Sequence, residues 1–395
     1  MPEKFVYADN AATTRVSQSV LDAMLPYFGE EYGNPSSLHS KGREASAALG
    51  DARARIAKLL GAKESEIYFT ASGSEADNWA VKGAAYANRD RGRHIVSTKI
   101  EHHAVLNSLK SLEREGFEVT LVDVDQGGRV SPEAVANAVR EDTVLVSVMT
   151  ANNEVGTIEP IAEINAAVKQ KNRKTLIFTD AVQAAGTLRL DVRELGVDML
   201  SLSGHKLHAP KGVGALYIRN GIRVSNLIDG GGQERSRRGG TENLPYIIGL
   251  AKALEDAVAG IDENARVAAM RDRLIDGILD KIPYTRLNGA REQRLPGNVN
   301  ISFDYIEGES LLLWLDMNGI CASTGSACSS ASLEASHVLL ALGVPVESAH
   351  GSLRLSLGRD NTDDDVDYIL RVLPGIVERL RAMSPLYEKV NGSKI

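Results

Sequence analysis

Two charged residues directly follow apolar, strand-like runs, and their types suit the chemistry of a carbonyl cofactor. Lys206 comes soon after the run MLSLS, and Asp180 ends the run LIFTD twenty-six positions earlier. In an open α/β sheet, ligands bind beyond the carboxyl ends of the strands, so we expect both side chains at one site. A desolvated lysine is a nucleophile for carbonyl carbon, and an aspartate can pair with a protonated pyridine nitrogen. The pattern favours pyridoxal phosphate, with a structural salt bridge as the alternative.

The segment TASGSEADN is a candidate for holding the phosphate of such a cofactor. It follows a predicted strand and opens a helix at Gly73 and Ser74. The free backbone N–H groups and the positive dipole end of that helix suit an anion. An ordinary capping box between Ser72 and Glu75 explains the same residues, and taken alone it is the better explanation.

The two cysteines differ in their surroundings. Cys328 lies in ASTGSACSSAS, a run without an apolar anchor, which predicts an exposed and flexible loop. A thiol there could act as a nucleophile that reaches a pocket. Cys321 follows Ile320 at a predicted strand start, which is typical of a small buried side chain.

Composition and missing motifs exclude several function classes. The chain has no GxGxxG, GxxxxGK[ST], HExxH or CxxC motif, so nicotinamide, P-loop and zinc sites lack their usual residues and we expect no metal site. A net charge of −7, spread along 395 residues, argues against binding to nucleic acid or to anionic lipid. No run approaches the roughly 20 apolar residues of a membrane helix. With only two cysteines and no secretory signal, the sequence predicts a cytoplasmic enzyme.

Short β-branched runs alternate with helical stretches over the first half of the chain. Strands are predicted near Phe69, Val96, Leu121, Val146, Phe178, Leu202 and Leu216. Helices are predicted from 75 onward and over 103–115, 132–140 and 160–171. This alternation predicts an α/β fold with a mixed, mostly parallel sheet covered by helices. Because the last two strands leave no room for a crossover helix, they predict an antiparallel edge.

The later part of the chain predicts a second, smaller α+β lobe. Two long helical stretches begin at Asn243 and Asn264, and NVNISF, SLRLSL and a terminal helix over 363–381 follow. We expect a large domain over 15–261, and a small domain formed by 1–14 together with 262–395.

Several segments together resemble the NifS/IscS-like cysteine desulfurases of the class V aminotransferase family. They are YADNAATT, YGNPSSLHSKGREA, EHHAVL, NNEVGTIEPI, TDAVQAAG, SGHKLHAPKGVGALY, RRGGTEN, STGSACSSAS and SLRLSLGR, in this order across essentially the whole chain. The resemblance implies the type I fold of pyridoxal-phosphate-dependent transferases. One departure lies in the phosphate turn, which reads Ala71-Ser72-Gly73 where relatives commonly have Ser-Gly-Gly or Ser-Gly-Ala.

The resemblance also implies a role for each matching residue. Lys206 would hold pyridoxal phosphate as a Schiff base, Asp180 would keep the ring nitrogen protonated, and His102 would stack on the ring and assist proton transfer. Gln183 would hydrogen-bond the phenolic oxygen. The residues implied for the phosphate are Gly73, Ser74, Ser203, His205 and, from the partner subunit of a homodimer, Thr241.

Substrate binding and sulfur transfer complete the implied site. Asn153 and Arg354 would hold the substrate carboxylate, and Asn153 would also contact the cofactor. The planar fork of Arg354 suits that pairing, although a surface ion pair is the ordinary explanation for an arginine. Cys328 would attack the sulfur of L-cysteine, keep it as a persulfide and release L-alanine. An iron–sulfur cluster scaffold protein or a thiolation enzyme would then accept the sulfur.

Two other functions remain open on the sequence. A selenocysteine lyase or another class V enzyme would share Lys206 and Asp180 without needing an exposed cysteine. A catalytically silent platform for cluster assembly is the non-enzyme alternative, but the intact set of Asp180, Lys206, Cys328 and Arg354 argues against it.

Overall fold

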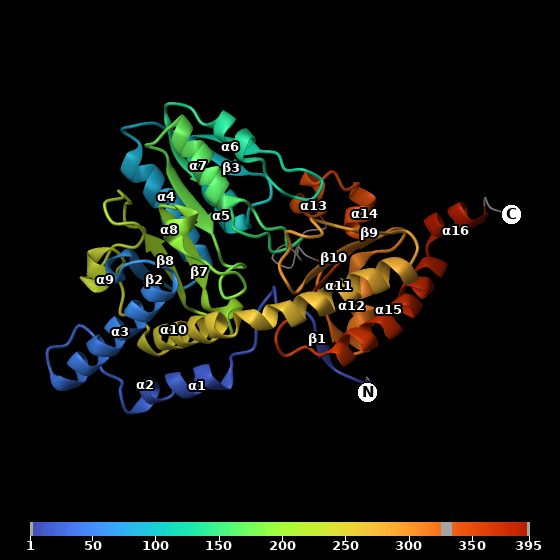
Figure 1. The fold of residues 1–395 in the computed structure, drawn as a ribbon, viewed down its shortest axis with the longest axis horizontal. Coiled ribbons are helices and arrows are strands. Elements are labelled where there is room, and N and C mark those ends of the chain that lie inside the picture. Colours follow the sequence, from blue (N-terminus) through green and yellow to red (C-terminus); the bar gives the residue numbers. More distant parts are fainter. Residues whose placement is uncertain (1–2, 325–333, 393–395) are drawn as a thin grey trace.

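The computed structural model describes residues 3–324 and 334–392, which form a larger and a smaller lobe (Figure 1). The larger lobe is built on a twisted sheet. In spatial order, the described strands of this sheet are β2 (Ile67–Thr70), β8 (Gly214–Ile218), β7 (Met199–Ser203), β6 (Leu176–Asp180), β5 (Thr143–Ser147), β3 (His94–Thr98) and β4 (Glu118–Val122). Each contains one of the predicted strand positions, so the mixed, mostly parallel sheet is confirmed.

One feature of the predicted topology is wrong. β8 runs antiparallel to β7, as expected from the short connection, but it does not form the edge. β2 pairs with β8 from the outside, antiparallel to it, and is itself the edge strand. The short connection between β7 and β8 is a local feature, so it predicts their antiparallel pairing. The pairing of β2 with β8 joins segments far apart in the sequence, so no local pattern predicts it.

Helices cover both faces of this sheet because the strands are apolar on both sides. In β8, Ala215 and Tyr217 belong to one hydrophobic cluster and Leu216 and Ile218 to another, as the two-residue period of a strand requires. The first cluster is completed by α3 (Ser40–Leu59), α6 (Pro132–Ala138), α7 (Ile161–Lys171) and α10 (Leu244–Ala259). The second is completed by α4 (Gly73–Asn88) and α5 (His103–Glu113). Short helices on this lobe are α1 (Gln18–Met24), α2 (Pro26–Gly29), α8 (Val192–Leu195) and α9 (Gln233–Ser236).

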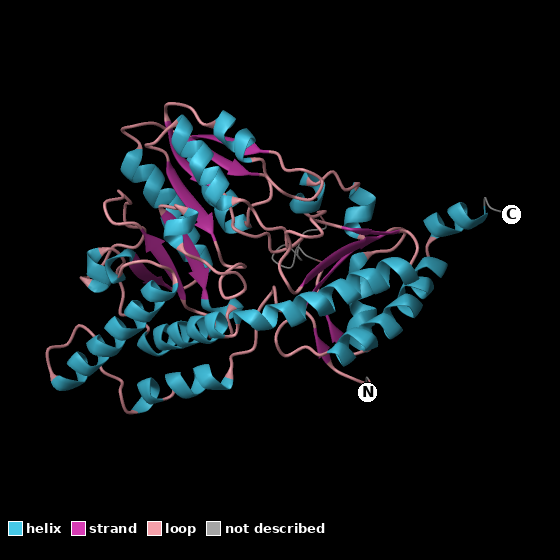
Figure 2. Ribbon diagram, viewed as in Figure 1, coloured by secondary structure: helices cyan, strands magenta, loops and turns pink. Residues whose placement is uncertain are grey.

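The smaller lobe packs three long helices on an antiparallel sheet (Figure 2). The described strands of this sheet are, in order, β12 (Ser352–Ser356), β10 (Asn298–Phe303) and β9 (Thr285–Leu287). The long helices are α11 (Asn264–Lys281), α12 (Gly308–Met317) and α15 (Asp363–Ala382), and the shorter ones are α13 (His337–Ala341), α14 (Val346–His350) and α16 (Pro385–Gly392).

The N-terminal segment joins the smaller lobe. β1 (Val6–Tyr7) pairs in parallel with β11 (Ile320–Cys321), and Val6 and Ala8 lie in the hydrophobic cluster of this lobe. The separate clusters support the expected division into 15–261 and 1–14 with 262–395, which stays a prediction. Cys321 is half-buried, and burial raises the pKa of its thiol, which fits a small structural side chain. Among the described residues, no helix combines the length and apolar character needed to cross a membrane.

Candidate active site

A cavity of about 390 Å³ lies where the carboxyl ends of β6 and β7 meet the smaller lobe. Most of the residues singled out in the sequence line it, although they come from segments spread over the whole chain. These are Gly73, Ser74, His102, Asn153, Asp180, Gln183, Ser203, His205, Lys206 and Arg354. The carboxyl ends of the strands therefore form the site, as expected for this sheet.

Lys206 reaches the cavity from a short 3-10 turn, η2 (Gly204–Lys206), directly after β7. Its ammonium donates hydrogen bonds to the carbonyl oxygens of Ala11 and Ala12, at 2.5 and 2.6 Å. Gln183 donates to the same Ala11 carbonyl at 3.0 Å. The N-terminal segment thus forms a wall of the cavity and orients the lysine, a role that its small residues gave no reason to predict.

The N-terminus of α4 forms another wall, where half of the expected capping box is present and phosphate binding stays a prediction. The Ser72 hydroxyl accepts from the Glu75 backbone N–H at 3.1 Å, which is one half of the expected capping box. The Glu75 carboxylate instead binds the Ala71 N–H and Arg238. The cap leaves Gly73 and Ser74 lining the cavity, where the end of a 16-residue helix suits an anion.

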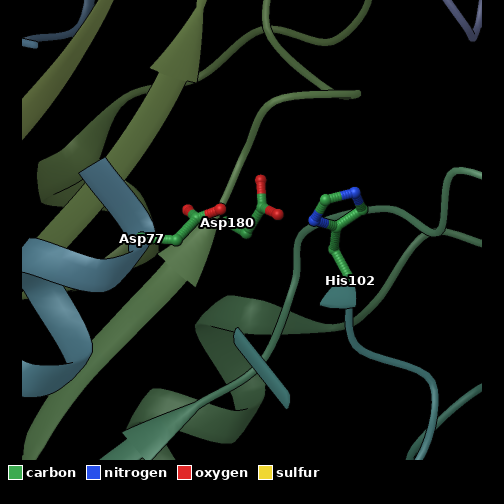
Figure 3. Close-up of side chains that lie close together, drawn as sticks. All are labelled: Asp77, His102 and Asp180. Carbon is green, nitrogen blue, oxygen red and sulfur yellow. The ribbon is translucent and has the colours of Figure 1, made fainter. Parts of the chain in front are cut away.

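Asp180 and His102 lie side by side in the cavity (Figure 3). Asp180 ends β6, and its carboxylate accepts the Val182 backbone N–H at 2.9 Å. His102 caps the N-terminus of α5, with Nδ1 accepting the Ala104 N–H at 3.1 Å. Because Nδ1 is an acceptor there, the proton of a neutral His102 ring sits on Nε2.

Burial sets the charge state of the titratable groups in the cavity. It raises the pKa of Asp180, while His102 and Lys206 lower it. It lowers the pKa of His205 to about 4, with Lys206 acting in the same direction. His205 is therefore neutral at neutral pH and can donate one N–H to an anion. A cation placed against Asp180 would further favour its ionised form.

A metal is the other group that Asp77, His102 and Asp180 could hold, because one ligand atom of each lies within 4.8 Å of the others. The contacts of these atoms argue against it. Asp77 Oδ1 and the Ser201 hydroxyl oxygen are hydrogen-bonded at 2.6 Å, and His102 Nδ1 is engaged by a backbone N–H. We propose no metal here, and the expectation that the chain needs none stays a prediction.

Arg354 lies in β12 with 2% of its surface exposed, so the surface ion pair considered above is wrong. One terminal nitrogen donates to the Asn153 carbonyl oxygen at 2.9 Å, and the other donates to Asp9 Oδ1 at 3.0 Å. Its guanidinium borders the cavity while Asp9 balances its charge. An incoming carboxylate would meet the only kind of side chain that offers a planar pair of donors.

Two predicted residues lie elsewhere. Cys328 falls within 325–333, outside the described residues. Thr241 is exposed on the loop before α10, beside Arg238 and away from this cavity, and its place in a partner subunit's site stays a prediction.

The sequence analysis missed several cavity residues. These are Ala11, Ala12, Ser72, Asp77, His103, Met149, Glu154, Val182 and His337. For Asp77 a signal existed, since an acid one helical turn after Gly73 faces the same side of the helix. The rings of His103 and His337 are in tilted contact, with centroids 4.6 Å apart, and only the fold creates this contact.

Comparisons with known proteins show the family of this chain. The family described as Aminotransferase class-V matches residues 6–369. The chain is 57% identical over 387 residues to the cysteine desulfurase IscS of Methanosarcina thermophila, covering 98% of this chain and 95% of that protein. It is 56% identical over 388 residues to a protein of the same name from Clostridium botulinum, covering 98% and 97%.

The fold is shared as well. A solved structure described as a NifS-like protein superposes with a TM-score of 0.90 at 42% identity, covering 95% of this chain and 100% of that one. Matches of this length and identity show the family. The chain belongs to the class V aminotransferase family, and within it to the NifS/IscS-like cysteine desulfurases.

Proposed function

We propose that this protein uses pyridoxal phosphate to remove sulfur from L-cysteine, leaving L-alanine and a persulfide on Cys328. The observation that carries the proposal is the convergence of Lys206, Asp180, the α4 N-terminus and Arg354 on one cavity. Each supplies a different requirement of the same reaction: attachment, ring charge, phosphate and substrate carboxylate.

The residues fit the cofactor. Asp180 is a buried carboxylate that needs a cationic partner, which a protonated pyridine nitrogen provides. Gly73 lets the helix end approach Ser203, since a Cβ at that position would lie 2.9 Å from Val182 Cγ2 and 3.1 Å from Ser203 Cβ. When bound, pyridoxal phosphate supplies an aldehyde for amino groups and a ring that withdraws electrons from the α-carbon of the substrate.

The chain supplies orientation and proton transfer. Arg354 and Asn153 would bind the substrate carboxylate, with Arg354 exchanging its contact with Asp9 for the substrate. His102 would hold a proton on Nε2 next to the reacting centre, because its other nitrogen is fixed by the Ala104 N–H. Nζ of Lys206 would offer a second site for a proton beside the reacting centre.

Cys328 is the proposed sulfur acceptor. Its thiolate would attack the substrate sulfur, the carbon–sulfur bond would break, and the α- and β-carbons left behind would become alanine after protonation. Residues on either side of 325–333 support this position. The Ser323 backbone pairs with that of Arg354, and the Ser336 hydroxyl donates to Glu154, so both flanks contact cavity residues.

The cellular context is also part of the proposal. We infer a homodimer in which Thr241 completes the partner's phosphate site, a cytoplasmic location, and an iron–sulfur scaffold protein or thiolation enzyme as sulfur acceptor. The exposed position of Thr241 and the family support these inferences.

The test is to incubate the pure chain with L-cysteine and a reductant, and to measure alanine and sulfide. Mass spectrometry should find one added sulfur atom on Cys328 before reduction. Cys328→Ser should abolish both products, and Cys321→Ser should retain them. Sulfide release by Cys328→Ser at the parent rate would disprove the persulfide step, and equal turnover of selenocysteine by Cys328→Ser would favour a lyase instead.

A further inference from the structure

Asp77 is a second buried carboxylate next to Asp180, and the proposed reaction gives it no role. It lies in α4 with 1% of its surface exposed. Figure 3 shows its side chain extending from the helix toward Asp180 at the end of β6. One carboxylate oxygen of Asp77 lies within 4.8 Å of one of Asp180. Two ionised carboxylates at this distance in a buried site repel each other, so the pair is expected to carry one negative charge.

Ser201 lies between the two acids. It occupies β7 opposite Asp180 in the strand register, and its oxygen is 2.6 Å from Asp77 Oδ1. Hydrogen bonding to the same hydroxyl lowers the pKa of both Asp77 and Asp180. A hydroxyl has one proton to donate but two acceptor positions. It therefore cannot serve both carboxylates as a donor, and one of them has to donate to it.

The surroundings decide which acid holds the proton. Asp180 faces His102, Lys206 and the Val182 N–H, all of which favour its anion. Burial raises the pKa of Asp77 well above the ordinary value, and its acidic neighbours Asp180 and Glu101 raise it further.

Glu101 is a third buried acid near Asp77, but it does not share the proton that we assign to Asp77. Burial raises the pKa of Glu101 to about 8, and its Oε1 accepts from the Thr98 hydroxyl and the Met149 N–H. It is thus a separate acid, held by its own donors.

We propose that Asp77 is a neutral carboxylic acid that donates its proton to Ser201 Oγ, so that the Ser201 hydroxyl donates in turn to Asp180 and holds it as an anion. Asp77 is then a positioning residue that acts on the cofactor through two hydrogen bonds of fixed direction. Such a chain strengthens each of its bonds, because each donor is polarised by the one before it. Only one part of this proposal rests on the proposed function, namely that Asp180 faces the protonated pyridine nitrogen of pyridoxal phosphate.

The protonation of Asp77 can be tested without any cofactor. Urea unfolding of the full-length chain at several pH values gives the folding constants of the parent and of Asp77→Asn. Above about pH 4 an unfolded aspartate is ionised, so the parent must take up a proton on Asp77 in order to fold. Its folding constant therefore falls as the pH rises, whereas that of the asparagine variant does not fall for this reason. The folding constant of Asp77→Asn relative to the parent should rise about tenfold per pH unit between about pH 5 and 7. A ratio independent of pH overturns the proposal.

Asp198→Asn is the matched control. Asp198 is also buried, with 2% exposed, but it pairs with Lys169 at 3.0 Å and Arg219 at 3.5 Å. Its carboxylate is charged in the fold, so its asparagine variant should be less stable than the parent, with no tenfold rise per pH unit.

The direction of the hydrogen bonds is tested with pyridoxal phosphate added to the cofactor-free full-length chain. Asp77→Asn keeps an N–H donor toward Ser201 and should bind within about twofold of the parent. Asp77→Leu and Ser201→Ala break the chain of donors and should each bind at least tenfold more weakly. Parent-like binding by Asp77→Leu would overturn the link to Asp180. If the parent itself bound no pyridoxal phosphate, the proposed function would fail, while the unfolding experiment would still decide the state of Asp77.

Discussion

Replacing Arg354 by lysine tests the substrate site while keeping the charge. Lysine is a point charge on a flexible stem and cannot present two parallel donors to a carboxylate. We expect the loss of one charge-assisted hydrogen bond, worth about 1.5–3 kcal/mol. Since 1.4 kcal/mol corresponds to about a factor of ten, kcat/KM for L-cysteine should fall roughly 10- to 150-fold, mostly through KM. The assay is alanine formation over a range of cysteine concentrations.

Two control variants separate binding from stability in this experiment. Arg294→Lys changes an arginine of the same lobe, 3% exposed, that donates to Asn298 Oδ1 at 2.9 Å and does not line the cavity. It should lower thermal stability and leave KM unchanged in the folded enzyme. Asp9→Asn removes the carboxylate that competes for Arg354, so it should not raise KM. An Arg354→Lys enzyme with the parent KM would refute the assignment.

Three further changes address the cofactor site and its acids. Lys206→Ala should lose the visible absorbance band of the bound cofactor and at least a thousandfold of activity, measured by spectroscopy and alanine release, because Lys206 is the only lysine among the described residues that line the cavity. Gly73→Ala should weaken pyridoxal phosphate binding at least tenfold in a titration, since the new methyl group would lie 2.9 Å from Val182. Glu101→Gln should gain stability relative to the parent by about 1.4 kcal/mol per pH unit from about pH 5 to 8 in urea unfolding. Burial raises the pKa of Glu101 to about 8, so the folded parent retains a proton that its unfolded chain releases.

The matching controls lie on the same elements or close to them. Lys211→Ala changes an exposed lysine of the loop after Lys206 and should keep the absorbance band. Gly50→Ala adds a methyl group in α3, where nothing lies within 4 Å of it, and should bind the cofactor like the parent. An absorbance band that survives in Lys206→Ala would contradict the assignment of Lys206. Equal affinity of Gly73→Ala and Gly50→Ala for the cofactor would contradict the assignment of Gly73. A pH-independent difference for Glu101→Gln would mean that Glu101 is ionised in the fold.

Local patterns were sufficient for the elements of the larger lobe. Its strands are short apolar runs that end at turn residues, and its helices begin at capping residues such as Ser72 and Ser131. These signals depend only on neighbours in the chain. The edge position of β2 did not follow from them, because strand order is set by packing between segments about 150 residues apart.

The candidate site also has features that could be predicted from local sequence and features that could not. The positions of Lys206 and Asp180 at strand ends, and the helix opening at Gly73, could be predicted because parallel strands deliver their carboxyl ends to one edge. The partners of these residues could not. That Lys206 binds the carbonyls of Ala11 and Ala12, and that Arg354 is balanced by Asp9, depends on how the N-terminal segment crosses between the lobes.

Adjacent residues and short motifs were sufficient to predict the family, the chemical types at the site and the alternation of strands and helices. Which groups meet across the cavity depends on how distant segments pack. The fold brings Asp77 and Ser201 next to Asp180, and the ring of His103 into contact with that of His337. The physical reason is that burial and charge coupling are properties of neighbours in space, and these govern the protonation of the buried acids.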